Sequence, residues 1–117
     1  MAKLQFLGHA ACYIEGTGLR ALVDPFLSGN PSATVGPEDF KQINYIFVTH
    51  GHDDHIGDTV EIAGNNGATV VANADLCRIF QRKGLKTHPM HIGGTFRFPF
   101  GMGKMTPALH GADVQEG

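Results

Sequence analysis

Six consecutive residues, His50-Gly51-His52-Asp53-Asp54-His55, hold three imidazoles and two carboxylates. In an extended chain, residues two apart point to the same side, so His50 and His52 can offer ring nitrogens to one ion. Asp54 and His55 follow where the chain bends toward the next helix, so they project at another angle and can reach a second ion nearby. Mixed imidazole and carboxylate ligands suit Zn²⁺, with Fe or Mn as substitutes, and suit Ca²⁺ poorly. The cluster predicts a zinc centre of one or two ions.

The alternative interpretation of these side chains is a solvated loop, but three histidines and two acids in six residues favour ligands. Asp53 lies between the expected ligands, so it is expected to face outward or to support them. His88 and His91 have no ligand-like spacing and are expected to be surface or structural residues. Neither Cys12 nor Cys77 has a base nearby in the sequence, so neither is expected to be a nucleophile.

The strand that carries the cluster is expected over residues 45–48, a continuous aromatic and β-branched run typical of a strand buried on both faces. Gly, Pro and Asn divide the rest of the chain into short apolar segments in a strand and helix order typical of the α/β class. Strands are expected over residues 3–7, 11–15, 19–24, 69–72 and 104–109, a surface loop over 25–37, one helical turn over 37–40, and helices from Asp58 or Thr59 to Gly67 and from Asn73 to Gly84.

Length and composition limit the function classes. A chain of 117 residues with 42% hydrophobic and 17% charged residues fits one globular domain. The formal charge is -2 and the nine Lys and Arg are scattered, so a nucleic-acid surface has no support. No apolar run approaches the roughly 20 residues of a membrane helix. Cys12 and Cys77 form no C-x-x-C pair and are expected to be buried, unpaired thiols. We expect a cytoplasmic protein with a small-molecule substrate.

The segment His50-x-His52-x-Asp54-His55 at the end of an apolar strand resembles the signature of the metallo-β-lactamase fold hydrolases. Other segments resemble one branch of them, the small, mostly uncharacterised metal-dependent hydrolases related to the ascorbate-phosphate lactonases. These segments are residues 8–12 (GHAAC), 24–31 (DPFLSGNP), 57–63 (GDTVEIA), 91–94 (HIGG) and 105–110 (MTPALH). The resemblance covers nearly the whole chain.

This resemblance implies that His50, His52 and His110 bind a first metal ion and that Asp54 and His55 contribute to a second. The sequence around His110 agrees, because this residue ends an expected strand and precedes a glycine. In this branch the loops that contain His9 and Asp24 face the site, so both are candidates for contact with the substrate or the ligands. Asp24 has an equal alternative, which is to cap the turn before Pro25.

The resemblance also implies that the chain is incomplete as a catalyst. The family fold is an αββα sandwich of two related halves, and the second half supplies further ligands of the second metal. Residues 1–117 resemble the N-terminal half alone, a mixed sheet with helices on its outer face. Its inner face, expected to include Phe6, Ile14, Leu22, Phe47 and Val71, would need a cover. We therefore expect either a homo-oligomer or a complex with the missing C-terminal half.

The function expected from the resemblance is hydrolysis of an ester, lactone, phosphoester or amide bond by a zinc-activated water. Zinc lowers the pKa of bound water far below that of bulk water, to about 7. Asp54 is expected to orient that water or take its proton. The alternative is a non-catalytic metal-binding or assembly half-domain that needs a C-terminal half for activity.

Overall fold

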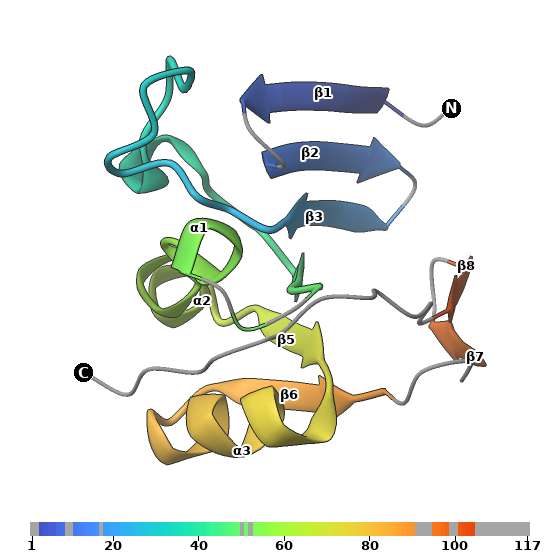
Figure 1. The fold of residues 1–117 in the computed structure, drawn as a ribbon. Coiled ribbons are helices and arrows are strands. Elements are labelled where there is room, and N and C mark those ends of the chain that lie inside the picture. The colour runs from blue at the N-terminus through green and yellow to red at the C-terminus, as the bar shows by residue number, and fades with distance from the viewer. Residues whose placement is uncertain are drawn as a thin grey trace.

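The computed structural model describes residues 3–8, 11–16, 18–49, 51, 53–90, 95–98 and 101–104. Strands β1 to β6 form one sheet in the order of the sequence, and β7 and β8 form a separate two-stranded sheet (Figure 1). The elements are β1 (Lys3–Gly8), β2 (Ala11–Gly16), β3 (Leu19–Val23), the 3-10 helix η1 (Pro37–Asp39), β4 (Tyr45–Phe47), α1 (Asp53–Ile56), α2 (Thr59–Asn66), β5 (Thr69–Ala72), α3 (Ala74–Arg82), β6 (Lys86–Pro89), β7 (Thr95–Phe98) and β8 (Gly101–Lys104).

The large sheet is mixed. β1, β2 and β3 form an antiparallel meander, whereas β3, β4, β5 and β6 are parallel. Each parallel connection is long, as the geometry requires: η1 precedes β4, α1 and α2 lead to β5, and α3 leads to β6. The α/β class and the mixed sheet expected from the sequence are confirmed.

Two of the expected helix boundaries rest on local chemistry that the structure confirms. Asn73 caps α3, because its side-chain oxygen accepts a hydrogen bond from the Leu76 amide at 2.9 Å. Gly67 ends α2 in the left-handed conformation, with φ of 66°. The segment expected as a surface loop is irregular, but Leu27 within it is buried in the core. Asn30 is also buried; its side chain donates to the Phe26 carbonyl and accepts from the Ser32 amide.

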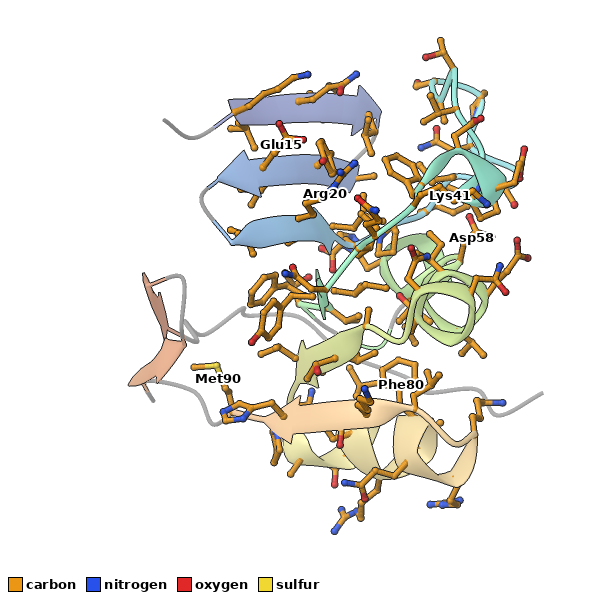
Figure 2. All side chains as sticks on the ribbon, turned by 180° about the vertical axis from the view of Figure 1, so that it is seen from behind. Glu15, Arg20, Lys41, Asp58, Phe80 and Met90 are labelled. Carbon is orange, nitrogen blue, oxygen red and sulfur yellow. The ribbon has the colours of Figure 1, made fainter. Side chains whose placement is uncertain are left out.

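Both main helices pack on one face of the sheet. Tyr13, Leu22, Ile46 and Val70 are cross-strand neighbours on that face. With Ile62 of α2 and Leu76 and Phe80 of α3 they form one buried core (Figure 2). The expected placement of helices on one outer face is therefore confirmed.

The opposite face is also apolar. Phe6, Cys12, Val23, Phe47 and Val71 form one continuous row of cross-strand partners across it. A second row contains Leu4, Ile14, Ala21 and Tyr45, and we call these two rows the open face. Exposure is greatest toward its edge, where Leu4 is 72% and Phe6 67% exposed.

Two expectations about this face need correction. Leu22 was expected on it with Phe6, but the register pairs Leu22 with Ile46, so Leu22 lies on the helix side. β4 was expected to be buried on both faces, yet Tyr45 and Phe47 are only partly buried, because the described helices cover the other face.

The last strand expected from the sequence, 104–109, lies outside the described residues except for Lys104, which ends β8.

Both cysteines are unpaired thiols, as expected. Cys77 of α3 is buried, and burial raises the pKa of its thiol above the usual value. The expectation that Cys12 is buried too is wrong: Cys12 of β2 is only partly buried, because it lies on the open face. Within the described part of the chain, no helix is long and apolar enough to cross a membrane.

Candidate metal centre

The candidate site lies where β3 and β4 end. Val23 and Phe47, the last residues of these strands, are partners in the parallel register. Asp24 and Thr49 therefore leave the sheet at the same edge, and the Asp24 amide donates to the Phe47 carbonyl at 2.9 Å. The carboxyl ends of parallel strands are a common place for ligand sites in open α/β sheets.

Asp24 is a buried residue at the centre of a partly buried hydrogen-bond network. It is 2% exposed and has φ of 45°, a left-handed conformation that Asp tolerates better than most residues. Its Oδ1 accepts from the Thr49 amide at 2.8 Å. Its Oδ2 accepts from the Thr49 hydroxyl at 2.7 Å and lies 2.7 Å from Nδ1 of His55. Of the alternatives stated for Asp24, this contact favours support of an expected metal ligand.

The contact with Asp24 defines the chemistry of the His55 ring. A carboxylate only accepts, so the proton of a neutral imidazole in this contact lies on Nδ1. Nε2 is then the unprotonated nitrogen that can bind a metal. Metal-binding histidines commonly donate their other ring N–H to a carboxylate in this way. His55 side-chain exposure is 16% against 3% for Asp24, so the ring lies between the buried carboxylate and solvent.

A second set of contacts holds the loop after Asp24. Oδ2 of Asp58 accepts from the amides of Leu27 at 3.0 Å and Ser28 at 2.8 Å. The Asp58 amide donates to the Pro25 carbonyl at 2.9 Å. Gly57, with φ of 49°, lies so close to this loop that a Cβ there would be 2.4 Å from the Pro25 oxygen. Hydrogen bonds and close packing thus hold the turn after His55 against the loop after Asp24.

The role of Asp58 corrects an expectation. Asp58 or Thr59 was expected to cap α2, and Asp58 does occupy the N-cap position, but its side chain makes no capping bond. Its carboxylate oxygen binds two loop amides instead. The Thr59 hydroxyl donates to the Ile56 carbonyl and is also not a cap.

The structure describes only part of the expected ligand set. His55 and Asp54 belong to α1, and His55 is in contact with Asp24. His9, His50, His52 and His110 lie outside the described residues. Among the side chains that are described, no three His, Cys, Asp or Glu residues gather as a metal site. The full ligand set therefore stays a prediction.

Sequence reasoning missed three residues at this edge, namely Thr49, Gly57 and Asp58. Thr49 stands directly before the histidine cluster, and Gly57-Asp58 directly after it. The signals were this adjacency and, for Gly57 and Asp58, the family resemblance of residues 57–63. Neither assigns a role, because a threonine or a Gly-Asp pair occurs in many loops without such contacts.

The chain resembles known proteins in both sequence and fold. The profile described as "Metallo-beta-lactamase superfamily" matches residues 5–117. A "UPF0173 metal-dependent hydrolase" of Carboxydothermus hydrogenoformans is 51% identical over 115 residues, which are 98% of this chain and 50% of the relative. A second protein of that description, from Desulfitobacterium hafniense, is 48% identical over 110 residues, or 94% of this chain and 47% of the relative.

Solved structures of metal-dependent enzymes share the fold of this chain. Igni18, a metallo hydrolase from Ignicoccus hospitalis, is 31% identical and superposes with a TM-score of 0.75 over 81% of this chain and 42% of its own. CmlA, a diiron β-hydroxylase from Streptomyces venezuelae, shares the fold with a TM-score of 0.60 at 21% identity. The chain spans about half the length of the curated relatives that it matches. By profile, relatives and fold together, the chain belongs to the metallo-beta-lactamase superfamily.

Proposed function

We propose that the chain is the N-terminal half of a metal-dependent hydrolase and supplies most of its metal ligands. His50, His52 and His110 would hold the first ion, and Asp54 and His55 would contribute to the second. The observation that carries the proposal is the 2.7 Å contact between Asp24 and Nδ1 of His55. A buried carboxylate that orients an imidazole by this nitrogen is typical of metal sites.

The donor set fits zinc best, with iron or manganese as substitutes, since imidazole and carboxylate ligands suit all three. When bound, zinc supplies a Lewis acid and lowers the pKa of water to about 7. Asp54 of α1 would orient the attacking water or take its proton. His9 would contact the substrate from its loop, and Asp24 would hold His55.

The proposed substrate is a small molecule with an ester, lactone, phosphoester or amide bond. The scattered basic residues and the net charge of -2 give no support to nucleic acid as a substrate. The two unpaired thiols accord with a reducing, cytoplasmic location.

A second candidate function is a non-catalytic metal-binding or assembly half-domain. The chain spans 50% of its Carboxydothermus relative, and its open face leaves Leu4 and Phe6 largely exposed. Either a C-terminal half or a second copy of the chain would cover this face, and we favour the C-terminal half because the relatives are twice as long.

The metal assignment can be tested by zinc analysis after dialysis. We expect the chain to retain about one zinc ion, because neutral imidazoles bind Zn²⁺ tightly. A variant with both His50→Ala and His52→Ala should lose it, whereas His88→Ala on β6 should not. Equal zinc in the double variant and the wild type would disprove the ligand assignment.

Activity can be tested by supplying the missing half. Zinc-loaded chain should hydrolyse ester, lactone and phosphodiester probes slowly, and the C-terminal half of the Carboxydothermus relative should raise the rate at least about tenfold by completing the site. The same mixture with His52→Ala should be inactive. A rate that stays at background with both halves and zinc present would support the non-catalytic function instead.

A further inference from the structure

We infer that Thr49 is a positioning residue, which holds His55 in a single tautomer and orientation through the carboxylate of Asp24. No feature of the sequence assigns a role to this threonine. The inference deepens the proposed function, and its metal consequence rests on that proposal, whereas the state of the His55 ring can be measured without any metal.

Thr49 binds the Asp24 carboxylate through two donors. Its amide donates to Oδ1 at 2.8 Å and its hydroxyl donates to Oδ2 at 2.7 Å, so one residue engages both oxygens of Asp24. Two donors from one residue fix the plane of a carboxylate, because rotation about its terminal bond would break both bonds. The Asp24 backbone is held as well, because its amide donates a hydrogen bond to the Phe47 carbonyl.

The fixed carboxylate then determines the state of the imidazole. Oδ2 accepts a hydrogen bond from the Thr49 hydroxyl and lies 2.7 Å from Nδ1 of His55, so one oxygen contacts both residues. The Asp24 side chain is 3% exposed, whereas Thr49, which supplies the donor, is an exposed residue. Without the hydroxyl, the described contacts left to the carboxylate are the Thr49 amide on Oδ1 and His55 on Oδ2, so the carboxylate and the His55 ring could turn together.

Thr49 also connects the Asp24 carboxylate to the segment that contains the first expected metal ligands. Thr49 directly precedes His50, and the preceding residue, Val48, is bound to β5 through its amide and the Val71 carbonyl at 3.0 Å. The strand end that leads to the first expected ligands is therefore tied to the same carboxylate that orients His55. One residue couples the two ligand groups.

The experiment compares Thr49→Val, which removes the hydroxyl at nearly constant size, with Thr49→Ser, which keeps it. Nitrogen NMR of the histidine rings in the metal-free, ¹⁵N-labelled chain reports which nitrogen carries the proton. We expect His55 to be an Nδ1–H tautomer in the wild type and in Thr49→Ser, and a mixture of tautomers in Thr49→Val. The ring signals of His88 on β6 report an intact fold, and Thr49→Ala is a second variant without the hydroxyl.

Zinc affinity is then measured by competition with a chelator. We expect the dissociation constant of the second zinc ion, the one to which His55 contributes, to rise about tenfold in Thr49→Val and to return to the wild-type value in Thr49→Ser, the range found when groups that orient metal ligands are removed. Wild-type His55 signals in Thr49→Val would overturn the inference, whatever the zinc affinity. A changed tautomer with unchanged zinc affinity would uphold it and would instead remove His55 from the proposed metal centre.

Discussion

Replacing Gly57 with alanine is expected to lower the free energy of unfolding by about 4 kcal/mol or more, near the upper end for single substitutions. A Cβ at this position would lie 2.4 Å from both the Pro25 oxygen and the Phe26 Cα. Both atoms belong to the backbone, so neither can move aside without shifting the loop. The φ of 49° adds strain, because L-residues other than glycine rarely adopt it.

Gly64→Ala is the matched control for this prediction. Gly64 lies inside α2, and an added Cβ would have no atom within 4 Å. Alanine favours the helix over glycine, so this variant should be more stable by roughly 0.5–1 kcal/mol. Urea unfolding followed by circular dichroism measures both variants. Equal stabilities for Gly57→Ala and Gly64→Ala would show that Gly57 does not pack tightly against the loop at Pro25 and Phe26.

The second large effect is expected for Asp24→Asn. Asparagine has nearly the same size and also tolerates the left-handed backbone, so the change acts on hydrogen bonding alone. The carboxylate accepts at both oxygens, from Thr49 and from Nδ1 of His55, whereas an amide nitrogen can only donate. An amide NH₂ facing His55 would move the ring proton to Nε2, the nitrogen assigned to the metal.

We expect Asp24→Asn to weaken binding of the second zinc ion, the one to which His55 contributes, by about 10- to 100-fold. It should also lower the free energy of unfolding by about 2 kcal/mol, because bonds to a charged, buried group are lost. Chelator competition and urea unfolding measure the two effects. Asp75→Asn is the control, since Asp75 is 77% exposed and pairs with Arg78 on the surface of α3, where such a pair contributes little. Wild-type zinc affinity in Asp24→Asn would disprove the role of Asp24.

Several elements could be predicted from the sequence because their causes are local. The apolar run that forms β4 needs only its own residues to favour a strand. Asn73 binds an amide three residues away, and Gly67 supplies a conformation that other residues adopt at a cost. The histidine cluster was visible for the same reason, since its residues are adjacent. The sequence by itself therefore determined the α/β class and where to look for the metal.

The tertiary structure decided how that region is held together. Asp24 contacts Thr49 and His55 across 25 and 31 residues, and only the parallel register of β3 and β4 brings them to one edge. Local rules made Asp58 a helix cap, but its carboxylate binds two loop amides that lie near it only in the folded chain.

The face occupied by Leu22 is a similar case. Ala21 and Leu22 are both apolar, so alternation along β3 could not show which of them meets the helices. The pairing of Leu22 with Ile46 settled it, because residues paired across strands share a face. Contacts between distant segments depend on strand register, and that register is set by packing of the whole sheet.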